Sequence, residues 1–166
     1  MTFDDIPSGA AVFIDANSII YHFISEPTYG VASTKFLERL ELNEIEGWIT
    51  PHILAEVSHR LMTLEACSLY GWPYQGIAAR LQKHPQHFAK LIRFRQAIED
   101  INRLGLQVIS VTTSHVLHAA EISQRSGLLT NDAISVAVMR SCGLTNLASN
   151  DTDFDHIADI IRFSPL

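Results

Sequence analysis

Four acidic residues, spread along the chain, occupy positions from which they could build one carboxylate site. They are Asp15, Glu56, Asp132 and Asp151. Four carboxylates brought together repel one another by roughly 4 kcal/mol per close pair in a surface-like dielectric, so such a site needs a hard divalent cation or shared protons. Mg²⁺ and Mn²⁺ prefer carboxylate and water oxygens, and Mg²⁺ often completes its shell with substrate phosphate. The chemistry that these residues predict is metal-assisted hydrolysis of a phosphodiester bond.

Two of these acids directly follow segments that have the pattern of buried strands. Residues 10–14 (AAVFI) form an apolar run typical of a strand buried on both faces, and Asp15 follows it. Residues 145–149 form another short strand candidate, with Asp151 in the acidic loop beyond it. In an open parallel sheet, ligands bind beyond the carboxyl ends of the strands. The sequence therefore predicts that Asp15 and Asp151 face one cleft.

The other two acids are expected on helices that lead into the same cleft. Thr50-Pro51 combines an N-cap with a proline at the first helical position, and it predicts a helix with Glu56 in its second turn. Asp132 begins a second helix, over about residues 131–142. Both helices follow short strand candidates, so their first turns can point toward the strand ends.

The rest of the chain also alternates between strands and helices. Further helices are expected over residues 33–46, 74–104 with a break near His84-Pro85, and 113–126, and further strands over residues 48–50, 106–111 and 160–163. This alternation predicts an α/β fold with a mostly parallel central sheet flanked by helices. With 166 residues, close to the length of one typical domain, residues 1–166 are expected to form a single domain.

Composition excludes several other classes of protein. The chain is 47% hydrophobic and 18% charged, which is typical of a globular protein rather than a disordered one. It has no apolar run of the roughly 18 residues that a membrane span requires, and no cationic leader, so a soluble cytoplasmic protein without membrane contact is expected. Its two cysteines, Cys67 and Cys142, form no zinc or redox pair and are expected to be buried thiols.

Other chemical motifs fail on particular residues. Residues 151–155 open like a calcium loop, but His156 replaces its obligatory glycine and Arg162 its closing glutamate. Asp155 is expected instead to cap a short helix. The eight histidines include no H-E-x-x-H zinc motif, and neither a glycine-rich nucleotide motif nor G-x-S-x-G occurs.

Four segments together resemble the PIN-domain nucleases, and among these the VapC-type toxins of bacterial toxin–antitoxin pairs. The segments are Phe13-Ile14-Asp15-Ala16-Asn17, Ile53-Leu54-Ala55-Glu56-Val57, Leu129-Thr130-Asn131-Asp132-Ala133 and Ala148-Ser149-Asn150-Asp151-Thr152-Asp153-Phe154. The resemblance extends over about residues 10–163 and implies a PIN-like fold. By position it implies metal binding by Asp15, Asp132 and Asp151, a water oriented by Glu56, and auxiliary roles for Asp153, Asn17 and Ser149. Ser149 replaces the threonine common in the family but keeps a hydroxyl.

The resemblance further implies an endoribonuclease that uses Mg²⁺ or Mn²⁺ and acts as the toxin of a toxin–antitoxin pair. A small antitoxin protein and a homodimer are the implied partners. Two alternatives compete with this interpretation. An aspartate-based phosphatase would require a second Asp at position 17, where Asn17 stands. A catalytically silent PIN-like module that binds RNA or protein would tolerate Asp132→Asn, which a nuclease would not.

A basic segment could bind the RNA that an acidic site repels. The formal net charge is −6, yet residues 66–98 contain no acid, and this segment is longer than in the smaller toxins. Its five cations are Arg80, Lys83, Lys90, Arg93 and Arg95. They are expected to contact an RNA backbone, the alternative being an ordinary solvated helix face. Trp72, Tyr74 and Phe88 could stack on bases if they are exposed.

Overall fold

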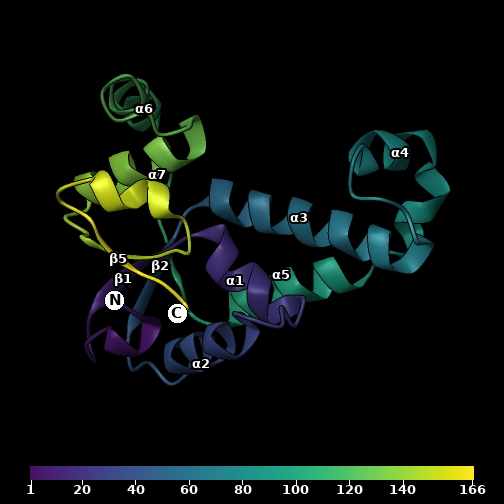
Figure 1. Ribbon diagram of the computed structural model, residues 1–166, viewed down its shortest axis with the longest axis horizontal. Coiled ribbons are helices and arrows are strands. Elements are labelled where there is room, and N and C mark those ends of the chain that lie inside the picture. The colour runs from purple at the N-terminus through teal and green to yellow at the C-terminus, as the bar shows by residue number, and fades with distance from the viewer.

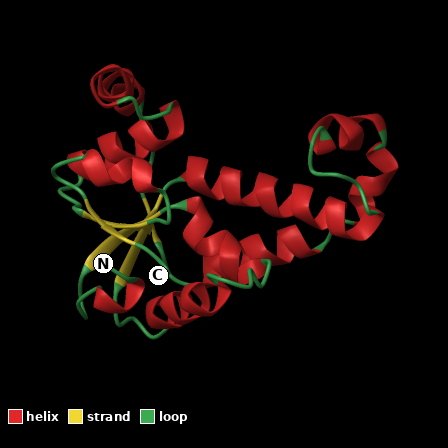
Figure 2. Cartoon of the chain, viewed as in Figure 1, coloured by secondary structure: helices red, strands yellow, loops and turns green.

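In a computed structural model of residues 1–166, five short strands form one parallel sheet (Figure 2). The strands are β1 (Ala11–Ile14), β2 (Glu46–Ile49), β3 (Gln107–Val108), β4 (Asn146–Ala148) and β5 (Ile161–Phe163). Their order across the sheet is β3-β2-β1-β4-β5, and every neighbouring pair is parallel. The predicted α/β fold with a parallel sheet is thereby confirmed.

β1 is the central strand because it is the most apolar. Val12, Phe13 and Ile14 are fully buried, as expected of a strand covered on both faces. Phe13 lies opposite Trp48 of β2 and Leu147 of β4. The chain adds strands on one side of β1 first and on the other side later. The carboxyl ends of β1 and β4 therefore form the topological switch point at which open α/β sheets bind ligands.

Seven α-helices and three 3₁₀ helices surround the sheet (Figure 1). The α-helices are α1 (Ala16–Phe23), α2 (Gly30–Glu41), α3 (Pro51–Tyr70), α4 (Ile77–Lys83), α5 (Arg93–Arg103), α6 (Thr113–Ser126) and α7 (Thr130–Ser141). The 3₁₀ helices are η1 (Phe3–Asp5), η2 (Pro85–Lys90) and η3 (Thr152–His156). In Figure 1, α6 and α7 lie above the sheet and α2 below it, while α3 projects away with α1 and α5 beside it. None of these helices combines the length and the apolar character that crossing a membrane would require.

Most helix boundaries follow the expected local signals. α3 begins at Pro51 and ends at Tyr70, and the next residue, Gly71, caps it with a φ of 63°, a left-handed conformation that glycine adopts readily. The helical segment after it is broken at His84, before Pro85, as predicted. α6 covers the predicted residues 113–126 and is capped by Thr112, where the sequence offered Thr113 or Ser114 as the cap.

The helix predicted over residues 33–46 is wrong at its end. α2 stops at Glu41, and Gly47, the residue directly after the predicted helix, lies inside β2. The reason for a glycine there is space, because a Cβ at Gly47 would lie 2.5 Å from Cδ2 of Leu106 and 2.7 Å from Cδ2 of Leu40. The sequence interpretation also missed α1, which starts directly after Asp15.

Two expectations about burial are also wrong. The strand predicted over residues 106–111 shrinks to the two residues of β3 at the edge of the sheet, where Gln107 and Val108 are exposed. Cys142 is exposed at the end of α7, and Cys67 is half-buried; both are free thiols.

The far end of α3 carries a small appendage that we call the distal knob, residues 71–91. It contains α4 and η2 and lies at the end of α3 remote from the sheet (Figure 1). Its apolar cluster, separate from the main core, is formed with α3 by Ala66, Ile77, Leu81 and Leu91. The knob is therefore packed independently of the sheet.

Candidate active site

Asp15 is held at the carboxyl end of β1 by three hydrogen bonds. It is the N-cap of α1, and one carboxylate oxygen accepts from the backbone N–H of Ala16 at 2.7 Å. The other, Oδ2, accepts from Oγ of Ser149 at 2.8 Å and from Nδ2 of Asn17. The half-buried carboxylate therefore has a fixed orientation at the switch point.

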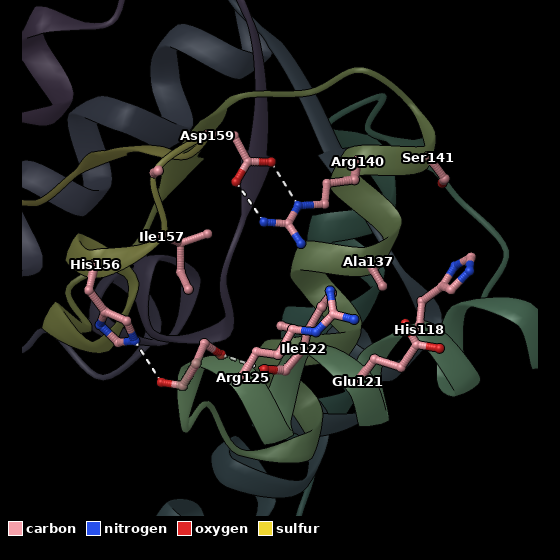
Figure 3. A pocket seen from close by; sticks show the side chains of 12 residues that line it. His118, Glu121, Ile122, Arg125, Ala137, Arg140, Ser141, His156, Ile157 and Asp159 are labelled. Carbon is pink, nitrogen blue, oxygen red and sulfur yellow. Dashed lines mark hydrogen bonds and ion pairs between the residues drawn. The ribbon is translucent and has the colours of Figure 1, made fainter.

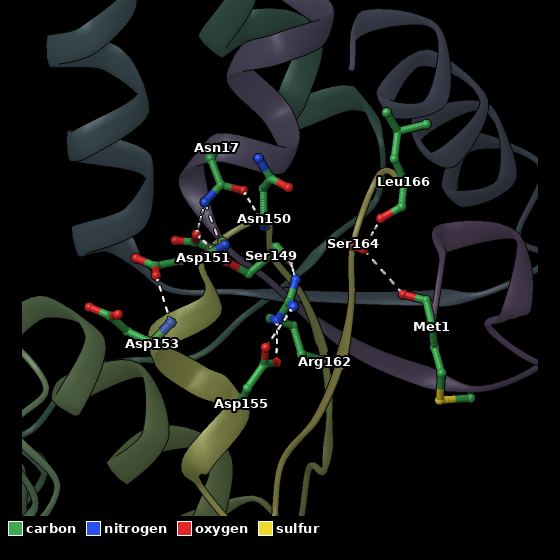
Figure 4. Close-up of polar contacts among 11 residues, drawn as sticks. Met1, Asn17, Ser149, Asn150, Asp151, Asp153, Asp155, Arg162, Ser164 and Leu166 are labelled. Atoms are coloured by element: carbon green, nitrogen blue, oxygen red, sulfur yellow. Dashed lines mark hydrogen bonds and ion pairs between the residues drawn. The ribbon is translucent and has the colours of Figure 1, made fainter. Parts of the chain in front are cut away.

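The loop after β4 is tied to the start of α1 by Asn17 and Ser149 (Figure 4). The backbone N–H of Asn150 donates to Oδ1 of Asn17 at 3.0 Å. The fully buried Ser149 hydroxyl accepts from the backbone N–H of Asp151, also at 3.0 Å. Asp151 in turn caps η3, because its Oδ1 accepts from the backbone N–H of Asp153 at 2.8 Å. The structure thus places Asn17 and Ser149 between Asp15 and Asp151.

Glu56 and Asp132 approach from the two helices that were predicted to carry them. Glu56 lies in the second turn of α3, and Asp132 lies in the first turn of α7. Nδ2 of Asn131 is 3.5 Å from Oε2 of Glu56, which links the two helices. Both acids are half-buried rather than fully exposed.

His52 is a neighbour of the acids that sequence reasoning did not single out for this site. Its Nδ1 lies 2.8 Å from Oγ1 of the buried Thr50, and its Nε2 lies 3.4 Å from Oγ of Ser135 on α7. Burial lowers the pKa of His52, which favours the neutral ring. A histidine one turn before Glu56 on the same helix was the available signal. His52 therefore joins the start of α3 to α7.

Electrostatics show that the acids share one environment. Burial raises the pKa of Asp15 to about 6; the Ser149 and Ala16 hydrogen bonds oppose this rise, and the charges of Glu56 and Asp151 add to it. Burial also raises the pKa of Asp132 to about 6. Smaller contributions to this rise come from the charges of Asp15, Asp151, Glu56 and Asp153. The carboxylates therefore repel one another across a small space.

An arginine behind the loop after β4 is already paired with an acid outside the cluster. Arg162 of β5, which sequence reasoning did not place here, binds the Asp155 carboxylate at 2.6 and 2.9 Å (Figure 4). It also donates to the Ser149 carbonyl at 3.1 Å and so braces the loop from behind. The expectation that Asp155 caps a helix is wrong, since Asp151 caps η3 and Asp155 lies inside it. No sequence spacing predicts this pair.

The oxygen atoms that these acids offer as ligands suit a hard cation, but the side chains are not close enough together to surround one. All candidate donors are carboxylate oxygens, with hydroxyl and amide groups beside them, as Mg²⁺ and Mn²⁺ prefer. No three His, Cys, Asp or Glu side chains converge closely enough to hold a metal ion. The acids form an open cluster whose uncompensated charge fits a divalent cation.

The five cations named in the sequence are not brought to the acids. Arg80, Lys83 and Lys90 lie in the distal knob, at the far end of α3 (Figure 1). Arg93 and Arg95 lie on α5, where Arg95 pairs with Glu99 at 3.2 Å. The first turn of α5 is also capped by the carboxylate of Glu65, which accepts from the backbone N–H groups of Ile92, Arg93 and Phe94 at 3.0 Å each. The cations therefore fall into two groups, and only the knob group is free of acids.

A cavity on another side of the chain is separate from the acidic cluster. It has a volume of about 620 Å³ and lies between α6, α7 and the segment before β5 (Figure 3). Arg140 and Asp159 form a two-pronged ion pair across it, with both contacts at 2.7 Å, and His156 binds the Ser126 carbonyl at 2.9 Å. None of the clustered acids lines it.

Comparisons with known proteins agree with this architecture. The family model described as the PIN domain matches residues 12–160. Ribonuclease VapC2 of Methanocaldococcus jannaschii is 25% identical over 148 residues, which cover 88% of each chain. The crystal structure of VapC20 of Mycobacterium tuberculosis, a sarcin–ricin loop cleaving toxin, superposes with a TM-score of 0.60 at 20% identity, covering 89% of this chain and 95% of that one. A toxin–antitoxin complex from Klebsiella pneumoniae gives 0.58 at 15% identity, covering 93% and 98%.

Proposed function

The chain belongs to the PIN domain family, and from that premise we propose that it is a metal-dependent endoribonuclease that hydrolyses RNA phosphodiester bonds. The observation that carries the proposal is the cluster of acids at the switch point. Asp15 and Asp132 both have a pKa raised to about 6, and neighbouring acids contribute to both shifts. Repulsion between carboxylates destabilises a folded protein, and strongly shifted pKa values of this kind are typical of functional sites.

Asp15, Asp132 and Asp151 are the residues that would hold Mg²⁺ or Mn²⁺. Ser149 and Asn17 keep the Asp15 carboxylate turned into the site, since both donate to the same oxygen, Oδ2. Asp153 stands at the exposed rim, where its charge still raises the pKa of Asp132. When bound, the metal would lower the pKa of a coordinated water and offset charge on the scissile phosphate.

Glu56 is the residue that would orient the attacking water. It lies on α3, and its carboxylate accepts one side-chain hydrogen bond, from the Asn131 amide at the long distance of 3.5 Å. A carboxylate with few hydrogen-bond partners retains free lone pairs for a water. The His52 ring, held between Thr50 and Ser135, supports the turn of α3 that precedes Glu56.

We extend the proposal to the biological setting. The relative from Methanocaldococcus jannaschii is named as a ribonuclease, and the Klebsiella pneumoniae structure is a toxin–antitoxin complex. By analogy this chain would act as the toxin of such a pair, form a homodimer and be inhibited by a small antitoxin protein. The analogy with these relatives supports this part of the proposal, whereas the acid cluster supports the chemistry.

The decisive experiment is cleavage of total cellular RNA by the purified protein with Mn²⁺ or Mg²⁺. The wild type, Asp132→Asn and a control variant, Asp4→Asn, are compared with and without EDTA. Asp4 is a suitable control because it is exposed in η1 and has no side-chain partner. Discrete cuts that need metal, persist in Asp4→Asn and disappear in the folded Asp132→Asn protein would support the nuclease.

One observation favours a competing function, a catalytically silent module that binds RNA or protein. No three metal-binding side chains converge, as they would in a closed metal site. If wild type and Asp132→Asn both leave a broad RNA panel intact while circular dichroism shows both folded, the nuclease proposal fails. RNA retention by both proteins in the same samples would then favour the binding module.

A further inference from the structure

We propose that the distal knob is a second RNA site, which holds a single-stranded segment of the substrate remote from the acidic cluster. The site is a hollow of about 390 Å³ beside α4, lined by Trp72, Gly76, Ala79, Arg80, Lys83 and His84. This inference rests on the proposed function for its ligand, since an RNA nuclease whose acids repel phosphate needs attraction elsewhere.

The three cations of the knob have no acidic partner, and the segment that carries them contains no acid. Five arginines of the chain form ion pairs with acids, but Arg80, Lys83 and Lys90 form none. No Asp or Glu occurs anywhere in residues 66–98, although the chain as a whole has a net charge of −6. Free cations concentrated on one appendage of an acidic protein create a local positive field that attracts a polyanion.

Arg80 is positioned at the hollow rather than left mobile. Its guanidinium carbon lies 5.6 Å from the centroid of the Trp72 ring, a cation–π distance. Trp72 is itself fixed by the rings of Tyr70 and His87, with centroids 4.8 and 5.1 Å away. Lys83 and His84 complete the polar wall. A planar cation held in one orientation suits the oxygens of a phosphate group.

Two aromatic side chains of the knob are exposed to solvent, and they favour a single strand as the ligand. Tyr74 is 48% exposed and Phe88 is 38% exposed. Stacking on such rings requires bases that are not already paired and stacked in a duplex, whereas a phosphate-only site would need no rings. Trp72 does not serve this purpose, because it is half-buried and packed within the knob.

The distance between the two sites sets a requirement on substrate length. Glu56 and Tyr70 mark the two ends of the relevant stretch of α3, and 14 residues of helix correspond to about 21 Å. A strand that occupies both sites must therefore extend several nucleotides beyond the scissile bond. The knob would select long, unpaired substrates.

The test measures RNA binding without cleavage. Full-length protein carrying Asp132→Asn is titrated in EDTA with a labelled single strand of about 16 nucleotides, the upper end of known single-strand site sizes. Three further changes are compared in that background: Arg80→Ala/Lys83→Ala, Lys83→Glu, and the control Lys35→Ala/Arg103→Ala. The control removes two cations from α2 and α5, outside the knob.

We expect about tenfold weaker binding for the Arg80→Ala/Lys83→Ala protein and unchanged binding for the control. The slope of log affinity against log salt should fall by about 0.7 for each cation that contacts phosphate. Lys83→Glu provides a second test in case the double variant misfolds. Lys83 is exposed and has no ion-pair or hydrogen-bond partner, so this variant should fold normally. It should also weaken binding, with an unchanged circular dichroism spectrum.

Three results would overturn the inference. One is that both knob variants bind RNA with the same affinity, and with the same dependence on salt, as the parent Asp132→Asn protein. Another is equally tight, knob-dependent binding of a duplex of the same sequence, which would exclude base stacking. The third is a change of molecular mass in the knob variants with RNA affinity retained, which would assign the knob to contact between copies of the chain.

Failure of this inference is distinguishable from failure of the proposed nuclease. Knob-dependent RNA binding by the Asp132→Asn protein, with no cleavage by wild type under any metal condition, would refute the nuclease alone. Cleavage by wild type, with RNA binding indifferent to Arg80 and Lys83, would refute the knob site alone.

Discussion

The hydroxyl of Ser149 donates a 2.8 Å hydrogen bond to Oδ2 of Asp15, across a separation of 134 residues. This contact joins the carboxyl ends of β1 and β4, and it opposes the rise in the pKa of Asp15 that burial causes. The ionised form of Asp15, which a cation would require, is therefore partly maintained by a neighbouring strand.

Ser149→Ala should lower RNA cleavage at neutral pH at least tenfold, because Asp15 and the Asp151 backbone N–H both lose their contact with the hydroxyl. A hydrogen bond to a charged group contributes about 1.5–3 kcal/mol, which corresponds to that range or more. Removing the donor also raises the pKa of Asp15 further, so the remaining activity should shift to higher pH. Ser149→Thr keeps the hydroxyl and serves as the control. Equal rate–pH profiles for wild type and Ser149→Ala would contradict this account.

Asp132→Asn should stabilise the metal-free protein while removing its activity. A carboxyl whose pKa is raised from 3.8 to about 6 destabilises the folded state when ionised, fully above pH 6 and not at all below pH 3.8. Allowing for solvent screening of this half-buried group, we expect a gain of about 1–2 kcal/mol, or a few degrees in Tm, at pH 7.5. The gain should vanish near pH 3.5. Thermal melts in EDTA at both pH values check it, and Mn²⁺ should raise the Tm of wild type more than that of the variant.

The Arg162–Asp155 pair should contribute stability that depends on pH in the opposite sense. The hydrogen bonds from Arg162 hold the pKa of Asp155 below its ordinary value of 3.8. Stability from this pair is therefore present above that value and is lost as the pH falls below it. Asp155→Asn should cost about 1 kcal/mol or less at pH 7, because the carboxylate is exposed, and progressively less as the pH falls below 3.8. Urea unfolding at pH 7 and at a pH below 3.8 measures the difference, and Asp4→Asn should show none at either.

Gly47→Ala should destabilise the fold by about 1–3 kcal/mol, the usual cost of overpacking a core. The added Cβ would lie 2.5 Å from Cδ2 of Leu106 and 2.7 Å from Cδ2 of Leu40, so both side chains must move. The urea midpoint should fall, while cleavage per folded molecule stays close to wild type. An unchanged midpoint would show that the two leucines shift without cost.

The elements that carry the acids were predictable because a buried strand requires an apolar run and a helix start has local sequence signals. The run before Asp15 is apolar on both faces, and Thr50-Pro51 fixes the start of α3 locally. α1 gave no such signal: its residues include Asn17, Ser18 and two β-branched isoleucines, which have modest helix propensity. Asp15 caps the helix locally, and burial of the isoleucines, which depends on tertiary structure, stabilises it.

For β3 the sequence predicted too much regular structure, because the strand expected over residues 106–111 has only two residues. Its segment is apolar because Leu106, Ile109 and Val111 pack, partly buried, against the core from the edge of the sheet. An apolar run alone does not distinguish that arrangement from a central strand. The contacts of Ser149, Asn17 and Arg162 around the acids were beyond sequence reasoning for a similar reason, since they join residues more than a hundred positions apart or lie behind the loop.

The pairing of β1 with β4 also determines when the acidic cluster can exist. Asp15 precedes its hydrogen-bond partner Ser149, at the carboxyl end of β4, by 134 residues. A growing polypeptide that has not yet exposed β4 cannot bring these carboxylates together, whatever else has folded. On the ribosome the cluster therefore stays unassembled until the segment that contains β4 and the following loop has emerged.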